Sequence, residues 1–345
     1  MRKLKFLTTT LVLSIALISC SDDDDTNTTD EPTADYQTQV FASNNSNGNV
    51  TMYDTSDPNN VSTKTFLTLS TDAEGVYYDA STDQLTQASR TFLQLNSYAD
   101  IGISNDGITL NIAASGSADL VSPRDIAVNG SVYVVSDNSD VDGDPTTADG
   151  RFFIYTKAGD QFTLRNTVTV NFAVWGIEFV GNNLYAVVDK TNEVALFTNF
   201  ASENTTDATI TATKRVAIEG IVRTHGLGFD DDTMILTDIG DAAVDSDGAF
   251  HIISDFETKF NAVANGETLV VANNQIRVAG SATFLGNPVS ADFDSETNTV
   301  FIAERANGGG RVLTYTNADV GGNIAPTVNS ELSGASAVYA QVTEL

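Results

Sequence analysis

The chain of 345 residues contains a single cysteine, Cys20, and only two histidines, His225 and His251. One cysteine cannot form an intrachain disulfide, a redox pair of thiols or a metal site built from several thiolates. The two histidines are too far apart in the sequence for their spacing to identify a metal-binding pair. Stability must therefore come from a hydrophobic core, for which 41% hydrophobic residues are sufficient.

Basic residues are scarce as well. The chain has 17 lysines and arginines against 46 aspartates and glutamates, and its formal net charge is −29. Such a chain repels nucleic acid and anionic head groups unless its basic residues cluster, and no basic cluster is present. We therefore expect no nucleic-acid partner. The surplus of carboxylates favours solubility and supplies oxygen ligands for hard cations such as calcium.

The N-terminus has the pattern of a secretory signal peptide. A basic start, Met1–Lys5, precedes an apolar stretch that is too short for a stable membrane span, and Leu17-Ile18-Ser19-Cys20 closes it. This ending resembles the lipobox of bacterial lipoproteins, in which the cysteine receives the lipid and becomes the new N-terminus. The acidic run Ser21–Asp25 resembles a surface-export signal of some Gram-negative lipoproteins.

The resemblance implies that residues 1–19 are removed and that Cys20 anchors the protein in the outer membrane, exposed at the cell surface. One acyl chain binds membranes only marginally, so the anchor needs more than one. Residues 20–36 are polar and aperiodic and are expected to form a disordered acidic tether. Residues 37–345 are expected to form one domain. The alternatives are a chance cysteine beside an ordinary signal peptide and an acidic run that is only a solvated tether.

Segments with helical periodicity are almost absent from the rest of the chain. Short runs of Val, Ile, Thr, Phe and Tyr recur instead between Asn, Asp and Gly clusters, which predicts strands and turns. One unit of three strands lies at Gly176–Phe179, Asn183–Asp189 and Glu193–Phe197. Similar units begin near residues 75, 125, 226 and 290. A repeat of about 50 residues with three or four strands predicts a β-propeller.

The two ends of the chain decide between a closed ring and a stacked array. The C-terminal Ser336–Tyr339 matches a first strand with nothing after it, and Gln39–Asn44 and Val50–Asp54 match second and third strands with nothing before them. Joined, they complete one repeat. The predicted fold is therefore all-β, a six-bladed propeller closed by pairing of the C-terminal and N-terminal strands. The alternative is a pair of β-sandwich domains, which would not explain the split repeat.

First strands of propeller blades line the central channel, so the residues just before the aligned positions should converge at its mouth. These residues include Glu74, Arg124, Trp175 and His225. An acid, a base, the only tryptophan and a histidine in one ring predict a polar ligand pocket with an aromatic wall. The alternative is structural: Arg124 and Glu74 neutralise each other while Trp175 plugs the channel.

A second set of acids, Asp137, Asp189, Asp238 and Glu304, ends the second strands, where bonding to turn backbone is the favoured role. After the first of them, a loop carries aspartates at alternate positions that could turn several oxygens toward one calcium ion. The candidate ligands are Asp137, Asp140, Asp142 and Asp144. The loop is not an EF-hand, because its glycine, Gly143, is misplaced and a proline follows. The alternative is a solvated loop on the rim.

From about Tyr36 onward the repeats resemble six-bladed propellers of the NHL and gluconolactonase/regucalcin-like kind. They are clearest at Gly176–Phe197, Gly226–Ile253 and Ser290–Tyr315. Ala73-Glu74-Gly75 resembles the Glu-Gly start of the lactonase-like group, which implies a metal-ligand role for Glu74. The asparagines that such a ligand set needs are not matched, since Trp175 and His225 stand near where one is expected.

Two functions follow. The preferred one is a surface lipoprotein whose propeller binds a carbohydrate, a peptide or an outer-membrane protein without catalysis. The alternative is a metal-dependent hydrolase or lactonase that uses Glu74, His225 and a carboxylate of the rim, with a divalent ion activating water. No nucleophile elbow, His-Glu-x-x-His sequence or P-loop is present.

Overall fold

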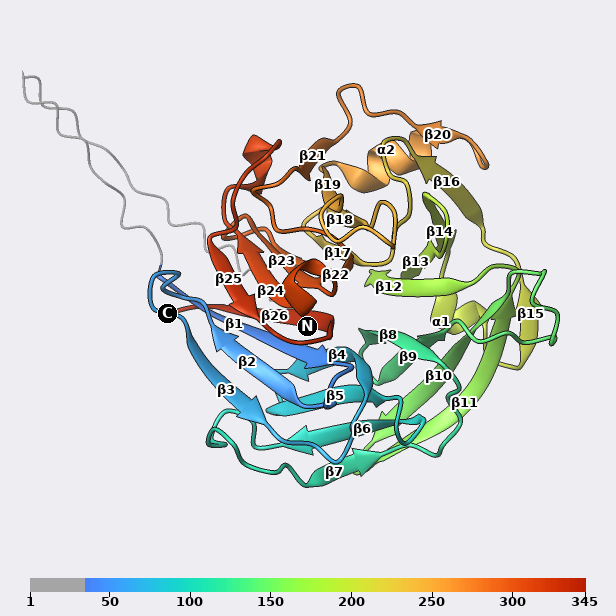
Figure 1. The fold of residues 1–345 in the computed structure, drawn as a ribbon. Coiled ribbons are helices and arrows are strands. Elements are labelled where there is room, and N and C mark those ends of the chain that lie inside the picture. Colours follow the sequence, from blue (N-terminus) through green and yellow to red (C-terminus); the bar gives the residue numbers. More distant parts are fainter. Residues whose placement is uncertain (1–34) are drawn as a thin grey trace, which may run out of the picture.

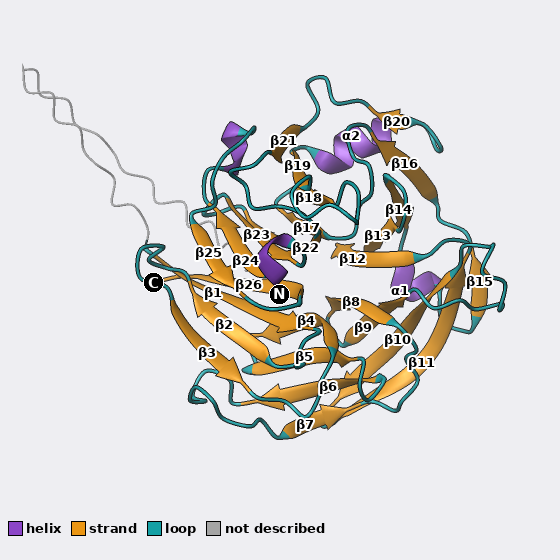
Figure 2. Cartoon of the chain, in the orientation of Figure 1, coloured by secondary structure: helices purple, strands orange, loops and turns teal. Residues whose placement is uncertain are grey.

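A computed structural model describes residues 35–345 of the chain. The predicted signal peptide, Cys20 and nearly all of the predicted tether lie outside these residues. The described part is almost entirely β-structure, arranged as sheets around a central axis (Figures 1 and 2). None of its helices combines the length and the apolar character that a membrane crossing would require.

Each unit of the ring is a run of four antiparallel strands. From the axis outward, the unit that contains both chain ends has β26 (Ala335–Glu344), β1 (Tyr36–Asn44), β2 (Val50–Asp54) and β3 (Ser62–Phe66). The second has β4 (Ala73–Asp79), β5 (Gln84–Ser89), β6 (Gln94–Ala99) and β7 (Ile112–Ser115). The third has β8 (Pro123–Asn129), β9 (Val132–Asp137), β10 (Gly150–Ala158) and β11 (Gln161–Val170). A single parallel pairing of Gln161 with Ser115 joins the second and third units into one larger sheet.

The remaining units have the same form. The fourth has β12 (Val174–Val180), β13 (Asn183–Val188), β14 (Glu193–Phe197) and β16 (Lys214–Ile218), with β20 (Thr268–Leu269) added in parallel. The fifth has β17 (Leu227–Asp230), β18 (Thr233–Asp238), β19 (Ala249–Ile253) and β21 (Ile276–Ala279). The sixth has β22 (Pro288–Asp294), β23 (Thr299–Glu304), β24 (Arg311–Tyr315) and β25 (Val328–Glu331). The short elements are β15 (Ala208–Ile210), α1 (Phe200–Glu203), α2 (Phe256–Ala262) and two 3₁₀ turns (Asn307–Gly309, Ala318–Val320).

The ring closes between the two ends of the described chain. Strand β26 pairs antiparallel with β1, with Val338 opposite Ala42 and Tyr339 opposite Phe41. The six inner strands contact one another in circular order around the axis, from β4 through β8, β12, β17 and β22 to β26, which contacts β4. The predicted all-β propeller, closed by its C-terminal and N-terminal strands, is therefore confirmed.

The hydrophobic core lies between neighbouring units. Along β13, Leu184, Ala186 and Val188 pack into the cluster shared with the third unit, and the intervening Tyr185 and Val187 pack into the cluster shared with the fifth. Side chains of a strand alternate between its two faces, so a sheet covered on both faces needs apolar residues at consecutive positions. This explains why the strands are apolar throughout rather than at every second residue.

Glycines allow the inner strands to approach closely just below the mouth of the channel. A Cβ atom on Gly226 would lie 2.6 Å from the Cα atom of Ser290, and one on Gly176 would lie 2.6 Å from the carbonyl oxygen of His225. The Gly176 N–H donates to that same oxygen at 2.9 Å. Because Trp175 and His225 directly precede these glycines, the tight packing of the inner strands also brings their side chains together.

Candidate functional site

A cavity of about 320 Å³ opens at the mouth of the channel. Its walls come from the inner strands and from the loops beside them, and its lining residues are Asn45, Asp72, Arg90, Arg124, Trp175, His225, Asn287, Val289 and Arg305. Three of the four residues expected at the mouth are among them. The fourth, Glu74, is fully buried and bonds to two of the lining arginines. The structure therefore brings all four predicted residues together, while their role in binding stays a prediction.

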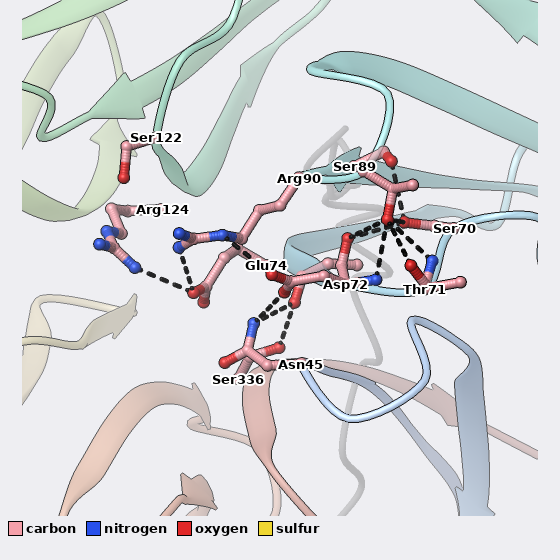
Figure 3. Close-up of polar contacts among 12 residues, drawn as sticks. Asn45, Ser70, Thr71, Asp72, Glu74, Ser89, Arg90, Ser122, Arg124 and Ser336 are labelled. Atoms are coloured by element: carbon pink, nitrogen blue, oxygen red, sulfur yellow. Dashed lines mark hydrogen bonds and ion pairs between the residues drawn. The ribbon is translucent and has the colours of Figure 1, made fainter.

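Glu74 lies at the start of β4, where its carboxylate binds two guanidinium groups. Its Oε1 atom accepts hydrogen bonds from Nη1 of Arg90 and from Nη1 of Arg124, each at 3.1 Å (Figure 3). Burial raises the pKa of Glu74, and the charges of Arg124 and Arg90 act in the opposite direction. The alternative to a ligand pocket was that Arg124 and Glu74 neutralise each other, and this ion pair is present. Arg90, however, adds a second positive charge beside the same carboxylate.

The aromatic side chains of the mouth form a stack. The indole of Trp175 lies against the imidazole of His225 with 3.8 Å between ring centroids and 7° between ring planes. The guanidinium carbon of Arg124 lies 4.1 Å from the centroid of the indole. A guanidinium over an indole is a favourable cation–π pair. Because both neighbours pack on the ring, the cavity meets the edge of Trp175 rather than the open aromatic wall that we expected.

His225 is oriented by a carboxylate. Its Nε2 atom lies 3.1 Å from Oδ1 of Asp189, which also accepts from Nε and Nη2 of Arg223 at 3.1 and 2.8 Å. Burial lowers the pKa of His225, although the bond to Asp189 opposes this. Burial also disfavours the charge of Asp189, but His225 and Arg223 together lower its pKa to about 2. The pair at neutral pH is thus a neutral imidazole against an ionised carboxylate.

Asp189 differs from the other acids at the ends of second strands. Asp137 accepts from the N–H groups of Val121 and Ser122 at 2.8 and 2.7 Å, which is the structural role that we favoured. Asp238 and Glu304 bind the equivalent loops in the same way. In the fourth unit, however, the last residue of the second strand that pairs with the first strand is Val188, whereas in the third unit it is Asp137. Asp189 therefore lies one residue beyond it and is available to side chains at the mouth.

Two arginines of the mouth were missed by the sequence analysis. Arg90 directly follows the end of β5 and Arg305 directly follows the end of β23. Both residues begin loops on the side of the channel mouth. Comparing the residue that follows the second strand of each repeat could therefore have identified them. Arg305 is exposed, bonds to the side chain of Asn45, and has no carboxylate within 4.0 Å in the described part of the chain.

The predicted calcium loop is built differently from our expectation. Asp140, Asp142 and Asp149 each place a carboxylate oxygen within 4.8 Å of the others. Asp137 is instead occupied by the Val121 and Ser122 N–H groups, and Asp144 accepts from Thr146 at 2.9 and 2.7 Å. The oxygen donors suit calcium, but whether they bind it stays a prediction.

The mouth itself does not fit a metal ion. Oε1 of Glu74 already holds two guanidinium groups, and among residues 35–345 the loop just described is the only group of three or more acidic, histidine or cysteine side chains close enough to share an ion. Three arginines facing the cavity would repel a divalent cation. The metal-ligand role that the resemblance implies for Glu74 is therefore not supported by this geometry.

A second, larger cavity lies between the first and sixth units. It measures about 420 Å³ and is lined by Asn44, Asn47, Asn49, Thr51, Tyr53, Thr63, Thr65, Ser330, Glu331 and Leu332. Glu331 is the only charged residue of this lining. Neighbouring units of a propeller diverge toward the rim, so a gap between them is expected there without a ligand. We therefore place the candidate site at the mouth, where charged, aromatic and polar side chains converge.

The comparisons with solved structures concern the fold. The chain is similar to a chain of a nidogen–laminin complex, with a TM-score of 0.58 and 12% identity over 88% of this chain and 98% of that one. It is also similar to a "putative 6-phosphogluconolactonase" of Bacteroides fragilis, with a TM-score of 0.55 and 11% identity over 92% and 100% of the two chains. A protein of the same description from Bacteroides uniformis gives 0.55 and 9% over 89% and 100%. No protein-family model and no curated protein matches the sequence. The neighbours support a β-propeller and carry no activity over at this identity.

Proposed function

We propose that the channel mouth binds a small anionic ligand. The observation that carries this proposal is the convergence of Arg90, Arg124 and Arg305 on one cavity, in a chain whose net charge is −29. Seventeen basic residues spread evenly over the surface would not gather in this way. Guanidinium groups are suited to carboxylates and phosphates because they present several donors in one plane.

The hydrogen-bonding groups of the mouth favour an acceptor-rich ligand. Arg124 uses only Nη1 on Glu74, and Arg305 uses Nη1 on Asn45, so each retains free donors. The indole N–H of Trp175 has no hydrogen-bond partner in the described part of the chain. Donors that face a cavity and lack protein acceptors are satisfied by water or by the oxygens of an anion.

The geometry of His225 is the reason that we propose binding without catalysis. The Nε2 atom of His225 faces Asp189, and its Nδ1 atom is buried without a hydrogen-bond partner among the described residues. A general base must reach the proton that it abstracts, directly or through one water. Neither nitrogen has this access, so His225 is assigned to holding Trp175 in place.

The test uses Trp175, the only tryptophan, whose emission reports on the mouth alone. Acetate and inorganic phosphate should change this emission in a saturable manner, and sodium chloride at equal ionic strength should not. Arg305→Gln should weaken binding about tenfold, since it removes the guanidinium that lacks a carboxylate partner. Arg215→Gln is the matched control, because Arg215 lies on the outer strand β16 with Glu193 as its partner. Equal affinities of both variants would contradict the proposal.

A second candidate is hydrolysis of a lactone. Its support is the similarity of the fold to the two solved proteins described as 6-phosphogluconolactonases, together with arginines that suit an anionic sugar derivative. The check is hydrolysis of glucono-lactone and its 6-phosphate, with and without chelator, against the spontaneous rate. No acceleration by the protein would leave binding as the function, whereas chelator-sensitive turnover would restore a metal-dependent mechanism.

We also propose that the protein acts at the outside of the outer membrane, anchored through lipid on Cys20. The signal sequence and the acidic run behind Cys20 support this location. Radiolabelled palmitate should label the expressed wild-type protein and not Cys20→Ser, and external protease should remove the propeller from intact cells. Labelling of both proteins, or protection from protease, would contradict the anchor or the surface exposure respectively.

Calcium in the loop of Asp140, Asp142 and Asp149 is a further proposal, supported by their converging oxygens. A bound ion raises the melting temperature in proportion to the logarithm of its concentration above Kd. Calcium should therefore raise the melting temperature of the wild-type protein but not that of Asp142→Asn. An identical melting curve with chelator and with millimolar calcium would count against it.

A further inference from the structure

We infer that the outer edge of β25, in the sixth unit, binds a short extended segment of another protein, which adds a parallel strand there. This site lies beside the larger cavity between the first and sixth units, and it does not depend on the anion proposed for the channel mouth. The inference comes from comparing the outer strands of the six units. Five of them have a further segment along their outer edge.

The five covered edges follow one rule. The covering segment belongs to the next unit, where it lies between the third and the outer strand or at the start of the outer strand, and it pairs in parallel. Two of these segments are the short strands β15 and β20, which lie outside β11 and β16 in Figure 1. The pairs are Leu67 with Thr109, Ser115 with Gln161, Val168–Val170 with Ala208–Ile210, Ala217–Ile218 with Thr268–Leu269, and Val278 with Gly322.

The rule fails where the sixth unit meets the first. By the same rule, the connection between β2 and β3, residues 55–61, would cover β25. This connection instead folds into a tight turn, in which the Asn60 N–H donates to the carbonyl oxygen of Asp57 at 2.9 Å. Val61 packs against the apolar cluster of this junction, but within residues 35–345 no segment pairs with the outer edge of β25. Such an edge presents unpaired backbone groups to any further strand.

The backbone groups that face this edge can be identified from the ladder. The Leu332 N–H donates to the carbonyl oxygen of Gly310 at 3.0 Å. Alternate residues of an antiparallel strand bond to the same neighbour. Ser330 therefore also bonds toward β24, whereas the N–H and C=O groups of Asn329 and Glu331 point to the open edge. Both of these residues are exposed, so the groups are accessible to a partner.

The cavity lies at the height where the other covering segments pair. It measures about 420 Å³, and Ser330, Glu331 and Leu332 form its wall on the sixth unit. Leu332 directly follows β25, just as the paired Leu67 directly follows β3. The opposite wall consists of side chains of the first unit, among them those of Thr51, Tyr53, Thr63 and Thr65. The cavity therefore occupies the place that a sixth covering segment would fill.

The five covering segments show which side chains suit this place. Each has an apolar residue that packs into the hydrophobic cluster between its own unit and the unit that it covers. In three of them a threonine directly precedes that residue. The apolar residues are Leu110, Phe162, Ile210, Leu269 and Ile324, and the threonines are Thr109, Thr209 and Thr268. We therefore expect the bound segment to contain a threonine followed by isoleucine or leucine.

Charge decides which molecule supplies the segment. The only charged residue of the cavity lining is Glu331, and the net charge of the chain is −29. A second copy of the chain would bring further negative charge to this edge, and so would residues 21–34 with their run Asp22–Asp25. Lysine or arginine beside the apolar residue would be attracted instead. The edge is therefore assigned to another protein that presents a basic, extended segment, in the manner of strand addition.

The experiment titrates a fluorescent peptide with the wild-type protein and follows its anisotropy. The peptide is Lys-Ala-Thr-Ile-Thr-Lys, which is the sequence of residues 208–211 with a lysine at each end. It should bind in a saturable manner. Proline in place of its isoleucine removes an N–H group and should weaken binding at least about tenfold, and aspartates in place of the lysines should also weaken it. Absence of saturable binding, or equal binding of the proline peptide, would overturn the inference.

Three variants locate the peptide. Glu331→Pro removes an N–H group of the open edge and leaves the bonds to β24, so it should weaken binding at least about tenfold. Glu331→Ala is the matched control, because it keeps that N–H group and should weaken binding by about threefold or less through the lost charge. Thr63→Trp fills the cavity from the first unit and should also abolish binding, even if Glu331→Pro does not fold. Melting curves establish folding, and wild-type affinity in a folded Glu331→Pro or Thr63→Trp would overturn the location.

Two other results would assign the edge to a different occupant. If deletion of residues 21–34 strengthens peptide binding more than about tenfold, the N-terminal segment of the chain itself covers the edge. If sedimentation finds a dimer for the wild-type protein and a monomer for Glu331→Pro, a second copy covers it. Either result would overturn the assignment to another protein and would leave the proposed anion site at the mouth untouched.

Discussion

Trp175 and His225 lie face to face, with ring centroids 3.8 Å apart and ring planes only 7° apart. Such a parallel contact places the only tryptophan of the chain directly against a titratable ring. The state of His225 should therefore be visible in the emission of Trp175, and so should any ligand that enters beside them. The consequences for pH, charge and packing can each be measured.

The first prediction concerns the protonation of His225. Burial lowers the pKa of His225 below the ordinary value of 6.5, so the stacked imidazole takes up its proton at a lower pH in the folded chain than in the unfolded chain. Since a protonated imidazole quenches indole emission, quenching of Trp175 by His225 should begin at a lower pH than an ordinary imidazole would give. The unfolded chain takes up this proton at a higher pH than the folded chain does, so the free energy of unfolding should fall as the pH drops through about 6.5. His225→Phe should remove that part of the fall, and an unchanged pH profile would refute the assignment.

The second prediction concerns the charge of Glu74. Glu74→Gln leaves two guanidinium groups with less compensation in a buried position, which should lower the free energy of unfolding by about 3 kcal/mol. The same change adds one positive charge to the mouth, so acetate and phosphate should bind more tightly than to the wild-type protein. A metal-ligand role for Glu74 predicts the reverse, a loss of function. Denaturant unfolding and calorimetry of the folded variant distinguish the two.

The third prediction concerns the carboxyl groups inside the channel. Burial raises the pKa values of Asp125 and Asp292 to about 7, although each accepts hydrogen bonds from backbone N–H groups. An acid whose pKa is higher when folded makes the protein less stable as the pH rises from about 4 to about 7, with no further change above that range. Asp292→Asn cannot ionise, and its one amide oxygen keeps an acceptor for only one of the two backbone N–H groups, of Ala340 and Phe293, that bond to Asp292. The melting temperature of the variant relative to that of the wild-type protein should therefore be higher at pH 8 than at pH 5, whatever the constant cost of the lost acceptor.

Asp160→Asn is the control for this comparison, because Asp160 is exposed in the turn between β10 and β11. It should change the melting temperature equally little at both pH values. If Asp292→Asn gives the same shift at pH 5 and pH 8, the channel carboxyl group does not titrate in this range.

The fourth prediction concerns the packing of the inner strands. Gly226→Ala places a Cβ atom 2.6 Å from the backbone of Ser290, and backbone cannot move aside as a flexible side chain can. Overpacking of this kind costs about 1–3 kcal/mol. Gly102→Ala is the control, since its nearest neighbour at 3.4 Å is a carboxylate oxygen of the Asp83 side chain. Equal melting temperatures of the two variants would show that the inner strands can shift.

Much of the candidate site could be predicted because the repeat places equivalent residues at equivalent heights. Glu74 and Trp175 each precede a glycine of an inner strand, and His225 precedes Gly226, which comes directly before β17, so aligning the repeats was enough to bring all three to one mouth. The register of single strands could not be predicted. Asp189 was grouped with Asp137, yet it lies one residue further along and contacts His225 instead of turn backbone. One residue is half the period of a strand, so such a slip changes what a side chain meets.

Arg90 and Arg305 were missed for a different reason. Each stands on a loop, where no periodicity marks the direction of a side chain, and their convergence depends on where the loops of the second and sixth units end in space. The calcium loop shows the same limit, since Asp149 joins Asp140 and Asp142 while Asp137 and Asp144 bond elsewhere.

The amino-acid sequence by itself determined the class of fold and the closing of the ring, because apolar strands of regular spacing and a repeat divided between the chain ends leave few other ways to bury the core. It also determined that the site is polar and lies at the ends of the inner strands. Only the tertiary structure decided the character of the site. Whether Glu74 faces a metal ion or two guanidinium groups, and whether Trp175 presents its face or its edge, depends on contacts between residues of different units. Those contacts are set by the packing of neighbouring units, which no local pattern records.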